Sequence, residues 1–334
     1  MTYIHRETID HPSAWTNASI GGKQGLVFQL RPECLDAFEE VLARTAHTAP
    51  LDVSRDEFDH PVVNATLAEI RHILRDGRGT VIVSGITRER FSEEAFERLY
   101  WGFGLHLGVP ASQSYRGDRL GRVTQTTVGP DNPINRGYKG SGELNPHTDN
   151  NVEIVGLMSV QKAAEGGYSL LASSTAIHNE IVATRPELLD TLYEGYYMSS
   201  EEASLSAKPV TDFKIPVFCY VDGTLSCLFN RGFYDRANRI RGDMPPEFDE
   251  ATKVITALSR RPDIQVRYIL EPGEMMFINN YTNLHARTPF ADSVEYKRSL
   301  LRLWLTVPDG RPVSDGFRRR AAGYKPGTEQ LPAH

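Results

Sequence analysis

The spacing of apolar residues differs between the first third of the chain and the rest. In the first third, apolar residues recur every three or four positions, which is typical of amphipathic helices. The predicted helices cover residues 35–46, 67–74 and about 93–104. Ser92, followed by two glutamates, is typical of the start of the third helix. Residues 79–85 form a β-branched run between two glycines, and this run predicts a buried strand.

From residue 122 onward the chain has short apolar segments with long connections. The predicted strands cover residues 152–160, 217–220, 225–229, 265–270, 275–279 and 299–307, and the predicted helices about 175–193 and 246–259. Many short strands that do not alternate regularly with helices favour a sandwich or jelly roll over a doubly wound sheet. The glycine pattern of a dinucleotide-binding turn is also absent from the sequence, so we expect no nicotinamide cofactor.

Composition narrows the class of protein further. The chain has 334 residues, 40% of them hydrophobic and 24% charged, which is typical of a globular protein. Nucleic-acid binding is not expected, because the net charge is −6 and the densest basic run, 318–320, is short. We interpret this run as a surface turn. No apolar run is long enough to span a membrane, and three cysteines are too few for a disulfide framework. We expect a cytoplasmic, soluble protein.

No low-complexity linker divides the sequence. We therefore expect one domain over residues 1–334, in which helical elements of about 30–110 pack on a jelly-roll core of about 120–310. Cys219 and Cys227 flank an Asp-Gly turn, which predicts a hairpin with both thiols buried as small apolar groups. His178 lacks a partner at metal-ligand spacing and is interpreted as a packing residue. The oligomeric state is not indicated by the sequence.

The first candidate site is the pair His147 and Asp149, which precedes the apolar segment 152–160. If this stretch is a strand, alternate side chains share a face, and the two donor atoms lie a few ångströms apart. That geometry suits a metal ion. The pair alone is also common in surface turns.

Two further features lie near the end of the chain. His285 follows an asparagine-rich stretch after the apolar strand 275–279. A polar stretch directly after an apolar strand is typical of a strand end that opens into a site. The simpler alternative is a histidine that is hydrogen-bonded within a loop. In residues 298–305, one strand face carries Arg298, Leu300, Arg302 and Trp304, and the other carries Ser299 and three leucines. A buried arginine needs an anion, which is either a ligand or a carboxylate of the protein.

Together these features match one known chemistry. Two histidines and one carboxylate form the facial triad of non-haem iron(II) oxygenases, which leaves three coordination positions open for a bidentate co-substrate and dioxygen. An arginine beyond the second histidine would bind the distant carboxylate of that co-substrate through a bidentate contact.

The order of these motifs resembles a known superfamily. His147-x-Asp149, Gly-Gly-Tyr-Ser at 166–169, His285, and Arg298 13 residues later resemble the 2-oxoglutarate-dependent oxygenases of the taurine dioxygenase/clavaminate synthase-like superfamily. The resemblance implies a mainly β fold with flanking helices, the double-stranded β-helix (a cupin-like jelly roll). It also implies Fe(II), 2-oxoglutarate as co-substrate, and dioxygen.

The resemblance also implies roles for individual residues. His147, Asp149 and His285 would bind the iron, and Arg298 and Ser169 would hold the 5-carboxylate of 2-oxoglutarate. Arg302 would either assist them or meet an anionic group of the substrate. The implied reaction is hydroxylation of an unactivated C–H bond with release of succinate and CO2, and it needs no separate acid or base. The carboxylate at position 149 argues against the halogenating branch.

The substrate is expected to be small and polar, either amino-acid-like or carboxylate-bearing. The candidate substrate residues are Gln113, Arg136, Tyr138, Asn145, Arg231, Asn280 and Tyr281. Two alternatives remain open. A zinc-dependent hydrolase would use the same His/Asp/His site but would leave Arg298 and Ser169 without a role. A non-catalytic jelly-roll binding protein would have no need of a complete ligand set.

Overall fold

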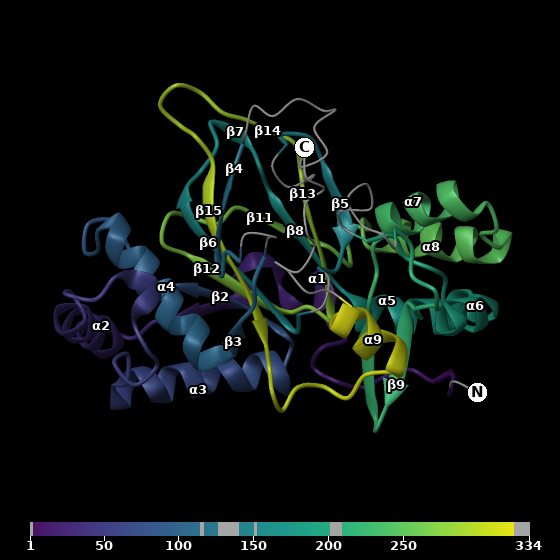
Figure 1. Ribbon diagram of the computed structural model, residues 1–334, viewed down its shortest axis with the longest axis horizontal. Helices are drawn as coiled ribbons and strands as arrows, with labels where there is room; N and C mark the ends of the chain where they lie inside the picture. Colours follow the sequence, from purple (N-terminus) through teal and green to yellow (C-terminus); the bar gives the residue numbers. More distant parts are fainter. Residues whose placement is uncertain (1–2, 114–116, 126–139, 150–151, 201–208, 324–334) are drawn as a thin grey trace, which may run out of the picture.

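Two facing β-sheets form the centre of the molecule (Figure 1). The computed structural model describes residues 3–113, 117–125, 140–149, 152–200 and 209–323. In this part of the chain the larger sheet has the strand order β1-β2-β12-β6-β15-β3, and β4 also pairs with β15. The smaller sheet has the order β11-β8-β13-β5. Most neighbouring strands are distant in sequence, as in a jelly roll, so the predicted mainly β fold is confirmed.

The strands agree with most of the predicted segments. The larger sheet contains β1 (Val27–Gln29), β2 (Thr80–Ser84), β3 (Val109–Pro110), β4 (Leu120–Thr124), β6 (Ile154–Gln161), β12 (Met275–Asn279) and β15 (Ser299–Thr306). The smaller sheet contains β5 (Leu144–His147), β8 (Ser169–Ser173), β11 (Val266–Tyr268) and β13 (Asn283–Arg287). Two short pairs complete the strands, β9 (Phe218–Val221) with β10 (Thr224–Cys227) and β7 (Glu165–Gly166) with β14 (Phe290–Ala291).

The two faces of the larger sheet pack against different partners. Along β15, Leu301, Leu303 and Leu305 point to the outer face, where helices cover them. Trp304 points inward and packs with residues of both sheets, among them Val155 and Leu171. The predicted division of this strand into two faces is therefore confirmed, and the inner face is the one that carries the arginines.

Three helices cover the outer face of the larger sheet (Figure 1). They are α2 (Pro32–Arg44), α3 (Pro61–Arg75) and α4 (Glu93–Leu107), with α1 (Asn17–Ile20), η1 (Gly22–Leu26) and η2 (Pro50–Asp52) between or before them. α2 and α3 each begin with proline, whose missing N–H costs nothing at the first helical position. The Ser92 hydroxyl accepts a hydrogen bond from the Ala95 N–H, which confirms the predicted N-cap of α4.

A second group of helices packs beside the smaller sheet (Figure 1). It consists of α5 (Ser174–Thr184), η4 (Pro186–Leu188), α6 (Leu189–Glu194), α7 (Arg231–Arg241), α8 (Pro246–Leu258) and α9 (Asp315–Gly323). The β9–β10 hairpin packs with them, and Cys219 and Cys227 are buried there as free thiols, as predicted. None of the described helices is both long and apolar enough to cross a bilayer.

Two sequence predictions in this region are wrong. The single helix predicted over about 175–193 is two helices, because Arg185 leaves the helical region (φ −145°, ψ 51°) and Pro186 follows it. The basic run 318–320 lies in α9 and not in a turn, and the Arg320 guanidinium donates to the Ser199 carbonyl. The division of the chain into one domain stays a prediction.

Buried His178 gives the fold a pH dependence. Burial, followed by the neighbouring His5, lowers the pKa of His178 to about 4. A folded-state pKa below the unfolded value of about 6.5 means that stability is complete above pH 6.5 and falls as the pH drops toward 4. We expect this residue alone to cost roughly 2 to 3 kcal/mol of unfolding free energy between pH 7 and pH 4.5. In urea unfolding, His178→Gln should lose correspondingly less stability over that interval, and the exposed His72→Gln should behave as wild type. Equal pH dependence in all three proteins would contradict this assignment.

Candidate functional site

The two candidate histidines meet because of strand pairing. β5 and β13 are antiparallel neighbours, and their register places His147 directly opposite His285, with ring centroids 4.2 Å apart. Asp149 Oδ1 lies 3.6 Å from His147 Nε2 and 3.8 Å from His285 Nε2. One ligand atom from each of the three residues lies within 4.8 Å of the others. In the described part of the chain, this is the one group of three such residues that could hold a metal ion.

Asp149 is brought close to the two histidines by a different interaction from the predicted one. β5 ends at His147, so strand alternation does not bring Asp149 to the site. A side-chain amide does so instead: the Asp149 N–H donates to Asn280 Oδ1 at 2.8 Å, and Asn280 Nδ2 donates to the carbonyls of Asp149 and Val152 at 2.8 and 2.9 Å. His285 lies within β13 and not in a loop.

The protonation states of the three residues suit a metal ion. His147 Nδ1 is 2.7 Å from the Asn145 carbonyl, which only accepts, so Nδ1 donates this hydrogen bond and Nε2 is the ring nitrogen that faces Asp149. Burial, followed by the neighbouring His147, lowers the pKa of His285 to about 3, so its ring is neutral near pH 7. Burial alone would raise the pKa of Asp149, but its interactions with the nearby His147, His285 and Arg302 side chains together hold this pKa below its usual range.

The donor set is therefore two imidazoles and one carboxylate. These are the ligand types of the facial triad that binds Fe(II) with open positions. His285 Nδ1 is buried and has no hydrogen-bond partner among the described residues.

A second part of the site surrounds Arg298. Arg298, Ser169, Gly166 and Gly167 line one pocket. Arg298 is only 7% exposed, and burial, with a smaller contribution from Arg287, lowers its pKa to about 10. In the described part of the chain no carboxylate lies within ion-pairing distance of its guanidinium. The internal ion pair considered from the sequence is thus not found there.

The backbone conformation and the nearby Arg298 side chain explain why this pocket contains two glycines. Gly166 and Gly167 both have left-handed φ values, +69° and +71°. A Cβ atom on Gly167 would lie 3.3 Å from both Cδ and Nε of Arg298, which is closer than side chains normally approach. Glycine at this position lets the chain pass next to the arginine side chain.

Arg302 lies four residues further along the same strand face, near Asp149 and His285. Its Nε donates to Gln113 Oε1 at 2.6 Å, and Gln113 Nε2 donates to the Arg302 carbonyl at 2.7 Å. Its charge acts on both Asp149 and His285, as their pKa values show. The candidate residue Gln113 is therefore a direct partner of Arg302.

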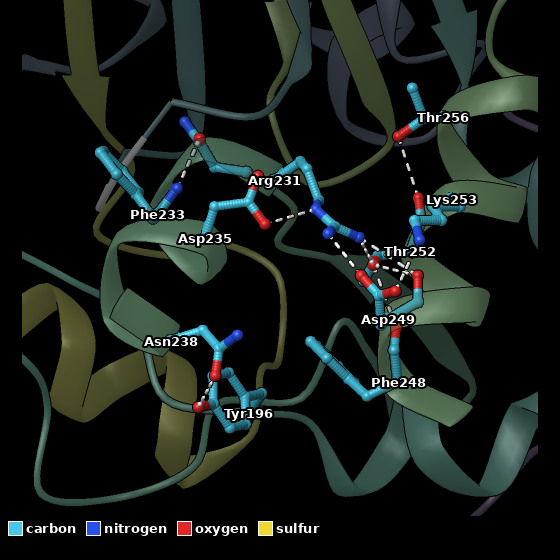
Figure 2. Close-up of polar contacts among 11 residues, drawn as sticks. Tyr196, Arg231, Phe233, Asp235, Asn238, Phe248, Asp249, Thr252, Lys253 and Thr256 are labelled. Atoms are coloured by element: carbon cyan, nitrogen blue, oxygen red, sulfur yellow. Dashed lines mark hydrogen bonds and ion pairs between the residues drawn. The ribbon is translucent and has the colours of Figure 1, made fainter. Parts of the chain in front are cut away.

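The structure does not bring all of the candidate substrate residues to the site. Arg231 Nε donates to Asp235 at 2.8 Å and its Nη1 to Thr252 Oγ1 at 2.6 Å, and Arg231 also pairs with Asp249 (Figure 2). These contacts join α7 to α8. Tyr281 is buried in the helical cluster beside the smaller sheet, with its ring centroid 5.8 Å from that of Phe317.

The other candidates have varied positions. Asn145 is exposed, and its side-chain oxygen accepts from Arg260, while its carbonyl orients His147. Asn280 positions the backbone of Asp149, as described above. Arg136 and Tyr138 lie outside the described residues.

One contact of the site was not predicted from the sequence. Trp304 Nε1 donates to Asp149 Oδ2 at 2.6 Å. The only signal for this contact was the position of Trp304 on the arginine-bearing face.

Comparison with known proteins settles the family. The model of the taurine catabolism dioxygenase TauD, TfdA family matches residues 43–304. The chain belongs to the TauD/TfdA family. It is a 2-oxoglutarate-dependent non-haem iron dioxygenase, as the sequence predicts, and it uses Fe(II), 2-oxoglutarate and dioxygen.

Individual relatives agree with membership of the TauD/TfdA family. FR-33289 synthase of Streptomyces rubellomurinus is 26% identical, over 97% of this chain and 98% of its own length. Asparagine oxygenase, solved with Fe(II), 3-hydroxyasparagine and succinate, superposes with a TM-score of 0.67 at 16% identity, covering 84% of this chain and 93% of that one. The non-heme iron oxygenase OrfP, solved with Fe and alpha-ketoglutaric acid, gives 0.64 at 16% identity, covering 91% and 99%. These superpositions confirm the double-stranded β-helix.

Family membership also decides between the functional alternatives. The interpretation as a non-catalytic binding protein is wrong, because the chain belongs to a family of dioxygenases. The zinc-dependent hydrolase has no support in these comparisons.

Metal binding should depend on the three clustered side chains. With anaerobic Fe(II) at about 100 times its dissociation constant, we expect wild type to gain about 2.7 kcal/mol of unfolding free energy. Asp149→Asn and His285→Ala should lose most of this gain, because each removes one ligand. His72→Ala is the control. His72 lies 3.2 Å from Asp76, and no third potential ligand joins this pair among the described residues. A full gain in Asp149→Asn and His285→Ala would place the metal elsewhere.

Proposed function

We propose that His147, Asp149 and His285 bind the iron, and that Arg298 and Ser169 hold the 5-carboxylate of 2-oxoglutarate. The observation that carries the second assignment is the buried Arg298 guanidinium, which has no carboxylate partner among the described residues and shares a pocket with Ser169. A buried cation of this kind is stabilised by an anionic ligand. The 5-carboxylate of 2-oxoglutarate is such an anion.

The two arginines of the strand face have separate partners in this proposal. Arg298 lies at the Ser169 end of the face, while Arg302 lies at the end near Asp149 and His285. Because Arg298 accounts for the co-substrate carboxylate, we assign to Arg302 the attraction of an anionic group of the substrate next to the metal. Gln113 holds the Arg302 side chain in place through its Oε1.

The substrate is a small molecule with a carboxylate, most simply an amino acid or a derivative of one. Two solved relatives support this class: asparagine oxygenase contains 3-hydroxyasparagine, and OrfP was solved with a hydroxylated arginine. The charge of Arg302 near the metal ligands supports it independently, because a bidentate arginine contact selects a carboxylate.

The protein positions the reactants. When Fe(II), 2-oxoglutarate and dioxygen are bound, the reaction converts 2-oxoglutarate to succinate and CO2 and inserts one oxygen atom into a substrate C–H bond. Arg298 and Ser169 fix the far end of 2-oxoglutarate, Arg302 orients the substrate anion, and the two imidazoles direct their Nε2 atoms toward the same carboxylate. The apolar residues between the two sheets exclude water from this region.

The assignment of Arg298 predicts the behaviour of the co-substrate. In an anaerobic titration of the Fe(II)-loaded protein, 2-oxoglutarate should produce a weak visible charge-transfer band. Arg298→Ala should need about 10- to 100-fold more 2-oxoglutarate, because it loses a charge-assisted bidentate contact worth about 1.5 to 3 kcal/mol. Arg298→Lys should recover only part of the affinity, because an ammonium lacks the bidentate geometry.

The control for this titration is Arg231→Ala, which also removes an arginine with several hydrogen bonds but lies in the α7–α8 contact. It should leave the affinity for 2-oxoglutarate unchanged. Equal weakening in Arg231→Ala and Arg298→Ala, or none in either variant, would rule out the Arg298 assignment.

The substrate class is tested by succinate release. Amino acids should stimulate succinate formation, and the matched amides, which lack the carboxylate, should stimulate it at least 10-fold less, since they lose the contact to Arg302. Arg302→Met should raise KM for the acid and alter the affinity for 2-oxoglutarate by less than about threefold, a difference below 1 kcal/mol. If acids and amides are equally effective, or if Arg302→Met weakens 2-oxoglutarate as strongly as Arg298→Ala does, this part of the proposal fails.

A further inference from the structure

The two oxygens of the Asp149 carboxylate have different surroundings. Oδ1 faces both imidazoles, at 3.6 Å from His147 Nε2 and 3.8 Å from His285 Nε2. Oδ2 accepts a hydrogen bond of 2.6 Å from the indole Nε1 of Trp304. A carboxylate can bind a metal through one oxygen or through both. In this site the second oxygen is already engaged.

Trp304 is held firmly in the position from which it makes this contact. It is 2% exposed and packs between the two sheets with Val155, its register partner on β6. The guanidinium carbon of Arg302 lies 4.5 Å from the centroid of its ring. A cation over the ring face is attracted to the indole and draws electron density from it, which makes the N–H a stronger donor.

We propose that Trp304 is a positioning residue that keeps Asp149 a ligand through Oδ1 alone. This inference rests on the proposed iron site. The facial triad works because three ligand atoms leave three positions for a bidentate co-substrate and dioxygen. If Asp149 bound through both oxygens, it would occupy one of those positions.

The chemistry of indole suits this task. Its N–H is a donor only, so it binds the carboxylate and cannot itself ligate the metal. Histidine in the same place would compete as a ligand, and lysine would add a charge next to Arg302. Partners of this kind, which orient a metal ligand, typically change metal affinity 10- to 100-fold when they are removed.

The test separates the hydrogen bond from the packing of the ring. Trp304→Phe keeps an aromatic ring between the sheets and loses the N–H. The matched control is Trp101→Phe, because Trp101 is also buried and its indole donates to a backbone carbonyl, that of Val53, at 3.0 Å. For each protein, anaerobic titration with Co(II) gives the dissociation constant and the visible ligand-field spectrum of the bound metal.

We expect Trp304→Phe to raise the Co(II) dissociation constant at least 10-fold and to change the ligand-field spectrum, while Trp101→Phe matches wild type in both. If Trp304→Phe binds Co(II) within twofold of wild type and with the same spectrum, the inference is overturned. If wild-type protein does not bind Co(II), or if His147→Ala binds it as tightly as wild type, the proposed iron site itself fails.

A measurement on wild-type protein covers the case in which Trp304→Phe does not fold. The chain has three tryptophans, so protein labelled with 15N at the indole nitrogen should give three indole signals. Titration with diamagnetic Zn(II) should shift the Trp304 signal, because its acceptor Asp149 becomes a metal ligand, and should leave the Trp15 and Trp101 signals in place. Three unshifted signals in the zinc-bound protein would overturn the inference.

Discussion

The pairing of β5 with β13 is the constraint on which the rest of the site depends. These strands are more than 130 residues apart in the sequence, and their register sets His147 opposite His285. Directly opposed residues on antiparallel strands have Cβ atoms about 5 Å apart, which is close enough for two imidazoles to share one metal ion. A shift of the register by one residue would turn one histidine to the other face of the sheet and abolish the site.

Around this pair the fold buries an unusual amount of charge. Arg298 and Arg302 are buried on the inner face of the larger sheet, and Asp149 lies just beyond the end of β5 with a largely buried side chain, so desolvation of all three charges is costly. Protein groups contact two of these charges: Trp304 and Asn280 bind Asp149, and Gln113 binds Arg302. The anion that we propose for Arg298 is the 5-carboxylate of 2-oxoglutarate, so we expect binding of the co-substrate to stabilise the interior.

The sequence predicted the apolar elements better than the polar ones. Strand 275–279 has the bounds that were predicted, because a continuous apolar run between polar residues has one interpretation. β5 and β13 were not predicted as strands, because their sequences are rich in histidine, asparagine and arginine, and nothing local shows that they pair. The motif order singled out Arg298 and the three side chains that the structure clusters, His147, Asp149 and His285. It could not show that Asn280 supports Asp149 or that Arg231 belongs to the α7–α8 contact, because these partners lie 131 and 18 residues away.

The most direct test of this account is a crystal structure grown without oxygen in the presence of Fe(II) and 2-oxoglutarate. The account predicts iron bound by His147 Nε2, Asp149 Oδ1 and His285 Nε2, with the 5-carboxylate of 2-oxoglutarate against Arg298 and Ser169. Iron bound at other residues, or a 5-carboxylate that contacts Arg302 and leaves Arg298 without an anion, would contradict it.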